Sequence, residues 1–114
     1  MTRVYRLALA TLLVTLALIV VGSVARLHPA GTGCGNAWPL CNGQIIPPLE
    51  WPALVEVAHR ILAISVLLLA SATTIAACIT PAASARVRAL AVSGLAVLLL
   101  QIVVGGLTAV LAAP

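Results

Sequence analysis

The stretch LVEVAHR, residues 54–60, brings an acid, an imidazole and a guanidinium into the start of a long apolar segment. On a helix, Glu56 and His59 project from the same side, and Arg60 can reach Glu56. Ionisable groups within a membrane span are costly and usually face a cavity or a partner. Imidazole is a common ligand of haem iron, so His59 is a candidate axial ligand. The alternative is that the three side chains only satisfy one another at a wet helix end.

The composition is typical of an integral membrane protein. Of the 114 residues, 63% are hydrophobic and 7% are charged, whereas soluble domains are roughly half apolar and a quarter charged. The net charge of +4 comes without a basic patch interleaved with aromatic residues, so no nucleic-acid partner is expected. A chain of this size forms a single domain and encloses little interior, so we expect it to need a partner.

Three apolar segments are long enough to cross the ~30 Å hydrocarbon layer of a bilayer. They cover about residues 4–26, 54–79 and 89–111. Because backbone groups in lipid must be hydrogen-bonded within their own segment, these segments are predicted to be helices. Pro81 should end the second one. The prediction is an all-α integral membrane protein with one transmembrane domain over residues 1–114.

Arginine placement predicts how the chain is oriented in the plasma membrane. Two arginines precede the first span, and Arg86 and Arg88 lie in the linker of residues 80–88. Both regions should be cytoplasmic by the positive-inside rule. The loop of residues 27–53 is then extracytoplasmic, with Arg26 as the single cation on that side.

The first segment could also be read as a cleaved signal peptide. Arg3 and Arg6 give it a basic start, and Ser23-Val24-Ala25 resembles a cleavage site. However, its apolar run is longer than the roughly 7 to 15 residues of a signal core. It also ends at an arginine, as a retained anchor would. We therefore expect a membrane span here.

The polar loop contains two cysteines within GTGCGNAWPLCNG, residues 31–43. Cys34 and Cys41 lie on the extracytoplasmic side of the predicted topology, where thiols tend to be oxidised. Gly35 and Pro39 between them allow the chain to turn back. A disulfide is therefore expected. It could be a local staple or, if it is exposed or strained, a redox-active bridge.

A few small or polar residues interrupt the apolar spans. Cys78 is predicted to be a small buried hydrophobe near the cytoplasmic end of the second span. Gln101 lies in the middle of the third span and needs a hydrogen-bonding partner, while Gly105 and Gly106 would allow a close helix or a flat ligand. Tight helix packing is the simpler explanation for these glycines. Gly22 in the first span lies at a similar extracytoplasmic depth.

The order of the motifs is more specific than any one of them. After Arg26 come G-x-G-C, W-P-L-C-x-G, a P-P pair, E-x-x-H-R at the opening of a helix, and L-Q-I-V-V-G-G-L-T in the last span. Together they resemble haem A synthase, the family of membrane enzymes that make haem A for terminal oxidases. The resemblance covers nearly the whole chain. It corresponds to the amino-terminal half of the usual two-repeat protein, or to most of a half-sized form.

The resemblance implies an oxidoreductase that converts the methyl group of haem O to the formyl group of haem A by successive hydroxylations, with water supplying the oxygen. His59 would match the haem-ligating histidine, with Arg60 beside it in the cofactor-binding segment. Glu56 would match a carboxylate near the substrate methyl, acting as a base or stabilising a cationic intermediate. Cys34 and Cys41 would match the outer-loop disulfide. Implied partners are haem b as cofactor, haem O as substrate, haem O synthase, an electron acceptor and the lipid bilayer.

This sequence departs from the family pattern in its helix count and its ligands. Family repeats have four helices with a second histidine on the fourth, whereas this sequence reaches Pro114 after three predicted spans. We therefore expect a homo-oligomer, a second-half subunit or a longer chain to supply the other axial ligand. Asn36 and Ala37 also stand just before W-P-L-C, where the family often has an acid, so the electrostatics of the loop are expected to differ.

Two other functions are compatible with these residues. One is a non-catalytic haem-binding assembly subunit that binds haem without turnover. The other is a membrane thiol-quinone oxidoreductase that passes electrons from Cys34 and Cys41 to a quinone. Such enzymes commonly need a C-x-x-C motif or a second cysteine pair, and the sequence has neither.

Overall fold

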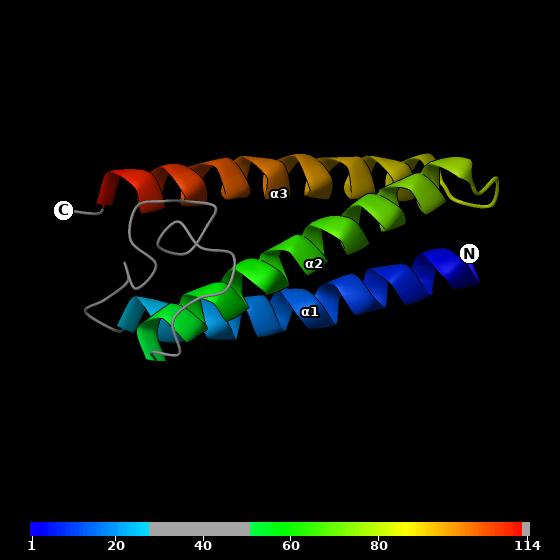
Figure 1. Ribbon diagram of the computed structural model, residues 1–114. Helices are drawn as coiled ribbons and strands as arrows, with labels where there is room; N and C mark the ends of the chain where they lie inside the picture. The colour runs from blue at the N-terminus through cyan, green and yellow to red at the C-terminus, as the bar shows by residue number, and fades with distance from the viewer. Residues whose placement is uncertain (28–50, 113–114) are drawn as a thin grey trace.

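The computed structural model describes residues 1–27 and 51–112. These residues form three long α-helices, α1 (Thr2–Leu27), α2 (Trp51–Ile79) and α3 (Ala85–Ala112), and no strand occurs among them (Figure 1). Each helix is long and apolar enough to cross a membrane. The structure therefore confirms the predicted all-α fold with three membrane-spanning helices.

The turn between α2 and α3 is set by a proline and a serine. Pro81 has no backbone N–H and cannot continue α2 comfortably. Ser84 then caps α3, because its Oγ accepts a hydrogen bond of 3.2 Å from the Val87 backbone N–H. This cap explains why α3 begins at Ala85, earlier than the expected start at residue 89.

Arg88 ties the two helices together at this turn. Its Nε donates to the carbonyl oxygen of Ala77 at 3.2 Å, and its Nη2 donates to the carbonyl oxygen of Thr80 at 3.1 Å. The last carbonyls of a helix have no partner within the helix, so a cation from the next helix satisfies them well. Arg88 was singled out in the sequence for the orientation of the chain in the membrane. In the structure it also closes the α2–α3 hairpin.

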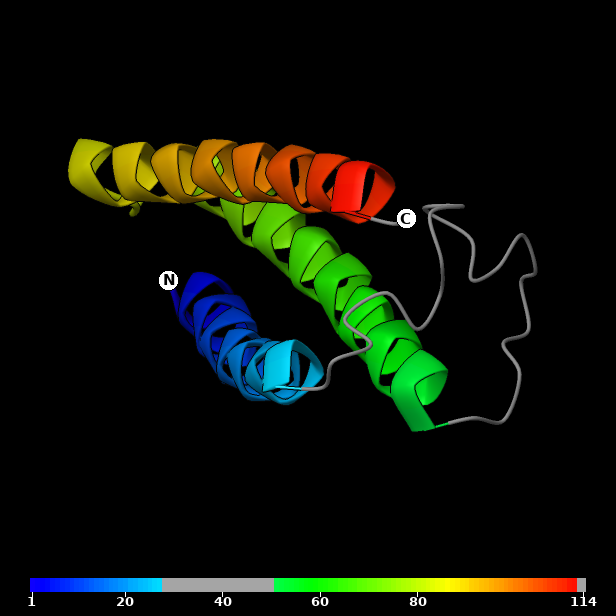
Figure 2. The same ribbon diagram turned by 90° about the vertical axis from the view of Figure 1, so that its left-hand side faces the viewer.

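The central helix of the three is α2. α2 packs against both α1 and α3, whereas α1 and α3 do not pack on each other in the described parts of the chain. The N-terminus of α1 and the α2–α3 turn lie at one end, which we call the turn end. The C-terminal end of α1 and the start of α2 lie at the other, the loop end. Both ribbon views show α3 moving away from α2 toward the loop end (Figures 1 and 2).

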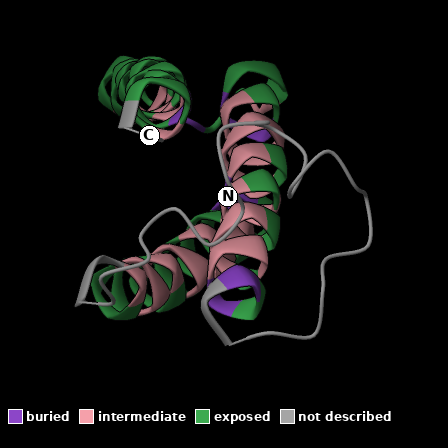
Figure 3. Ribbon diagram, turned by 60° about the vertical axis from the view of Figure 1, so that its left-hand side comes forward, coloured by how far each residue is buried: buried purple, intermediate pink, exposed green. Residues whose placement is uncertain are grey.

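The best-packed part of the structure is at the turn end. Val4 of α1 is buried with Ala76 and Ala77 of α2, and Leu7, Val87 and Ala91 pack around them. Alanines at a crossing allow helix backbones to approach closely, which is how helices associate where there is little water. Elsewhere most large apolar side chains are exposed, and much of α3 has an exposed surface (Figure 3). These surfaces are suited to lipid or to another protein.

The prediction that Cys78 is a buried hydrophobe is wrong. Cys78 is exposed, whereas its neighbours Ala76 and Ala77 are buried. Successive residues of an α-helix point about 100° apart. The two alanines therefore occupy the face of α2 that meets the other helices, and Cys78 faces outward.

Eight Ser and Thr hydroxyl groups, in the helices or just after α2, are hydrogen-bonded to the turn before them. Each donates to the carbonyl oxygen four residues earlier, as Thr and Ser commonly do in apolar surroundings. Two further bonds cross from one helix to another. The Oγ1 atoms of Thr11 and Thr73 are 3.2 Å apart, and Thr74 Oγ1 donates to the carbonyl oxygen of Ala91 at 3.2 Å. The residues with the intrahelical bond are Thr11, Thr15, Ser23, Ser65, Thr73, Thr74, Thr80 and Thr108.

Candidate haem site at the loop end

An ion pair lies near the start of α2. Arg60 Nη2 is 3.4 Å from Glu56 Oε2, one helical turn away, and the two side chains are only 16% and 12% exposed. Two opposite charges that are largely removed from solvent stabilise each other. The pair therefore helps the carboxylate to stay charged in an otherwise apolar helix.

His59 lies next to this pair and faces α1. Its side chain is partly buried. A Cβ atom built on Gly22 of α1 would lie 3.1 Å from both Cδ2 and Nε2 of the imidazole. The backbone of α1 thus passes directly against the ring. No residue in the described part of the chain hydrogen-bonds to either ring nitrogen.

The neighbouring surface at the loop end is apolar. A cavity of about 340 Å³ lies between α1 and α2, close to His59 in sequence on one helix and to Gly22 on the other. None of the residues that line it has a side chain that could bind a metal ion. Its walls are Val20, Val21, Val24, Leu54, Val55 and Ala58.

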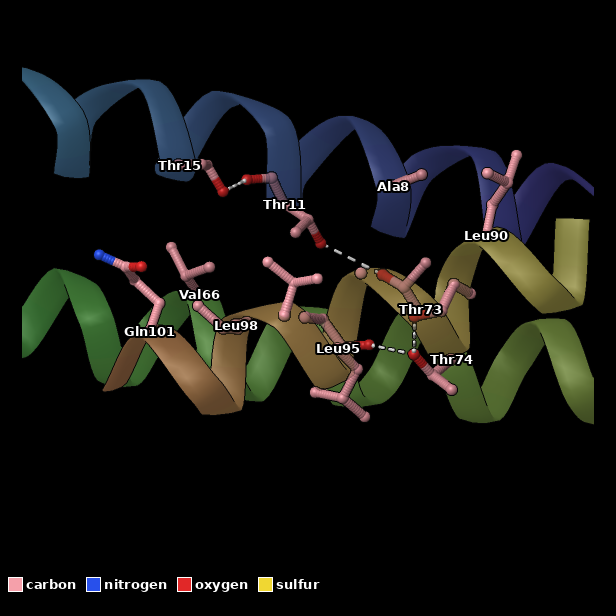
Figure 4. Close-up of a pocket in the computed structure, with 14 residues that line it drawn as sticks. Ala8, Thr11, Thr15, Val66, Thr73, Thr74, Leu90, Leu95, Leu98 and Gln101 are labelled. Atoms are coloured by element: carbon pink, nitrogen blue, oxygen red, sulfur yellow. Dashed lines mark hydrogen bonds between the residues drawn. The ribbon is translucent and has the colours of Figure 1, made fainter. Parts of the chain in front are cut away.

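A second cavity lies further along the helices, toward their middle. It measures about 400 Å³ and is lined by all three helices. Gln101 of α3 and Thr11 of α1 reach into it from opposite sides (Figure 4). Its lining does not include Glu56, His59 or Arg60, so it is separate from the loop-end site. Its walls are Ala8, Thr11, Thr15, Val66, Ala70, Thr73, Thr74, Leu90, Ala91, Gly94, Leu95, Val97, Leu98 and Gln101.

The structure brings together some of the residues singled out in the sequence. Glu56, His59 and Arg60 gather on two turns of α2. Gly22 joins them from α1, although the sequence indicated only its depth in the membrane. Gly105 is different, since a Cβ built there would meet nothing within 4 Å. Cys34 and Cys41 lie outside the described residues.

The donor set at the loop end suits haem better than a bare metal ion. The described residues contain no group of three or more His, Cys, Asp or Glu side chains that could hold a metal. Haem iron takes its in-plane ligands from the porphyrin and needs only axial ligands from the protein. One imidazole between apolar helix surfaces fits that requirement as a single axial ligand.

Comparison with known proteins supports the resemblance in the first half of the chain. Residues 5–53 match the model of a family described as cytochrome oxidase assembly protein. Proteins named heme A synthase are also similar. The one from Geobacillus kaustophilus is 42% identical over 55 residues, which cover 47% of this chain and 17% of the relative. The one from Bacillus licheniformis is 37% identical over 54 residues, which cover 47% of this chain and 18% of the relative. The one from Bacillus mycoides is 38% identical over 56 residues, which cover 48% of this chain and 18% of the relative.

These matches have clear limits along the chain. The chain spans less than a fifth of the length of these curated relatives. The family match ends at residue 53, just before Glu56. No solved structure matches the chain. The comparisons therefore confirm the resemblance to haem A synthases over the amino-terminal half, in a partial form.

Proposed function

We propose, from the family relationship of its amino-terminal half to haem A synthases, that this chain is part of an enzyme that oxidises haem O to haem A. The observation that carries the proposal is the position of His59. It is the one histidine within a described helix, and it lies partly buried between α1 and α2 beside an ion pair. A membrane protein that binds haem needs such an imidazole in dry surroundings.

In this proposal His59 would hold a haem at the loop end. When bound, the haem would supply a redox-active iron, and the chain would supply the surroundings. The apolar residues lining the loop-end cavity, among them Val24 and Val55, would keep water away from the bound group. A dry site strengthens electrostatic interactions within it.

Glu56 is proposed to be the catalytic carboxylate. Oxidation of a methyl group to a formyl group with oxygen from water releases protons, while the electrons leave in pairs to an acceptor. A base beside the substrate is therefore needed, and Glu56 lies one turn from His59 on the same side of α2. Arg60 holds this carboxylate through the 3.4 Å ion pair and fixes its direction. Arg60 would also provide positive charge at a site that holds the acidic side chains of a haem.

The second axial ligand is proposed to come from another copy of the chain, a second-half subunit or a further part of a longer chain. The exposed apolar surface of α3 is suited to such a neighbour, and α3 leaves α2 at the loop end where it would be needed (Figure 2). Cys34 and Cys41 are proposed to form a disulfide on the extracytoplasmic side, with the N-terminus in the cytoplasm. These proposals rest on the arginine distribution and on the family resemblance.

The experiment is to express the chain in membranes that make haem O and to measure haem A by mass spectrometry. Glu56→Gln should retain haem and lose haem A formation, because the amide keeps the shape of the side chain but cannot accept the proton. Glu50→Gln is the matched control, since Glu50 is the only other acidic residue in the chain. It should behave as the unchanged protein.

Unchanged haem A formation in Glu56→Gln would remove Glu56 from the mechanism. Haem binding without haem A formation in the unchanged protein would instead support a non-catalytic haem-binding subunit. A protein that neither binds haem nor makes haem A would contradict the proposal as a whole.

A further inference from the structure

We infer that Gly22 is a positioning residue, whose missing side chain lets α1 lie against His59 and fix the direction of the imidazole. The inference rests on the proposed function, in which that imidazole ligates haem iron. It adds a residue from a different helix to the site. The motifs that carry the family resemblance begin after Arg26 and do not include Gly22.

The contact at Gly22 is closer than ordinary packing allows for a side chain. A Cβ there would lie 3.1 Å from Cδ2 and 3.1 Å from Nε2 of His59. Carbon atoms in favourable contact are about 3.5 to 4.0 Å apart. An alanine at this position would therefore require the ring or α1 to shift by a few tenths of an ångström.

Two glycines of α3 differ from Gly22 in this respect. Cβ atoms built on Gly94 and Gly105 of α3 would meet nothing within 4 Å. Gly22 lies within the sequence V-V-G-S-V of residues 20–24, which is otherwise mostly valine. Glycine inside a helix is destabilising by about 0.5 to 1 kcal/mol relative to alanine. The close approach of the imidazole gives a physical reason for a glycine here.

Among the described residues, no hydrogen bond orients the imidazole ring of His59. Histidine ligands of metals usually donate their second N–H to a carboxylate or a carbonyl, which fixes the ring direction. In the part of the chain that the structure describes, His59 makes no such bond. Packing against the α1 backbone at Gly22 takes the place of that bond. A shifted ring would be less well oriented to bind a haem.

The test compares Gly22→Ala with Gly105→Ala in the full chain. Supporting groups around a metal ligand typically change affinity 10- to 100-fold, so Gly22→Ala should weaken haem retention by about 10-fold. Its ferric electron paramagnetic resonance spectrum should also change, because the ligand direction changes. Gly105→Ala adds the same methyl group where there is space, and both measurements should match the unchanged protein.

A second measurement uses the haem-free protein. The chain has only two histidines, so ¹³C-labelled histidine gives two sets of ring signals, and His28→Gln assigns them. Gly22→Ala should shift the His59 ring signals while the helical circular dichroism is unchanged. Gly105→Ala should leave those signals in place.

Each outcome of these measurements decides the inference. Wild-type haem retention and wild-type ring signals in Gly22→Ala would overturn it. So would a loss of haem that is accompanied by loss of helical structure, since the glycine would then serve folding and not the ring. The proposed function fails separately, if His59→Ala retains haem like the unchanged protein. In that case the ring signals of the haem-free protein still report whether Gly22 positions His59.

Discussion

The two ends of the helix bundle are held by different kinds of contact. At the turn end, the side chain of Arg88 bonds two carbonyls of α2, Ser84 caps α3, and Ala76 and Ala77 pack against α1. At the loop end, an ion pair and a partly buried imidazole lie between α1 and α2. α3 takes less part there, because it diverges from α2 (Figure 1).

This difference separates an end whose contacts serve the structure alone from an end whose groups could also do chemistry. The turn end satisfies its backbone groups and fills its crossing with small side chains. The loop end keeps an ion pair and an imidazole, which a tightly packed apolar core would exclude. We therefore expect substitutions at the turn end to affect stability alone, and those at the loop end to affect haem as well.

The largest effect on stability should come from breaking the loop-end ion pair. In Arg60→Met the Glu56 carboxylate loses its 3.4 Å partner in surroundings that are largely shielded from solvent. Removing one member of a fully buried pair typically costs about 3 to 5 kcal/mol. This pair is only part-buried, so we expect a loss of roughly 2 to 3 kcal/mol. Reversible unfolding in mixed micelles, followed by circular dichroism, measures it. The double variant Glu56→Gln with Arg60→Met should recover most of the loss, and a single variant as stable as the unchanged protein would contradict this view of the pair.

A smaller effect is expected from Arg88 at the turn end. Arg88→Met removes two hydrogen bonds from a cation to the carbonyls of Ala77 and Thr80. Hydrogen bonds to charged groups contribute about 1.5 to 3 kcal/mol, so the free energy of unfolding should fall by about 2 kcal/mol. The amount of haem per folded chain should not change.

Arg86→Met is the matched control for this variant, because Arg86 is exposed in the first turn of α3, close to Arg88. Exposed substitutions usually change stability by less than about 0.5 kcal/mol. If Arg88→Met released haem from chains that remain folded, the proposed division between the two ends would be wrong.

The smallest effect should come from the hydroxyl contact between α1 and α2. Thr73→Val removes the 3.2 Å bond between the Oγ1 atoms of Thr11 and Thr73 and keeps the shape of the side chain. Such bonds between membrane helices average about 0.6 kcal/mol. Thr108→Val is the control, since its hydroxyl is exposed and bonds only to the Val104 carbonyl of its own helix. Equal changes in the two variants, measured by the same unfolding experiment, would show that the interhelical bond contributes nothing.

The sequence alone was sufficient for the fold class because the bilayer allows few solutions. Long apolar runs must be helices, and Pro81 marks where the second one stops. The start of α3 was missed because it depends on a cap, in which Ser84 Oγ bonds the Val87 N–H. A serine before an apolar run is a readable signal, and it could have been given more weight.

Which faces are buried was harder to predict. α1 and α3 are apolar around their whole circumference, and the charged residues of α2 lie only near its start, so the sequence did not mark which face of α2 meets its neighbours near Cys78. This is why Cys78 was placed on the wrong side. The group of Glu56, His59 and Arg60 could be predicted because its members are close in sequence. The contact of His59 with Gly22 could not, because it depends on how α1 and α2 cross.

The central claim is that His59 ligates haem, and haem content tests it most directly. The full chain is purified from membranes in mild detergent with the subunits that accompany it, and its Soret absorbance is measured per chain. His28→Ala is the matched control, because His28 is the only other histidine. We predict a Soret band in the unchanged protein and in His28→Ala, and its loss in His59→Ala while the helical circular dichroism is kept. A Soret band of unchanged intensity and position in His59→Ala would contradict the account.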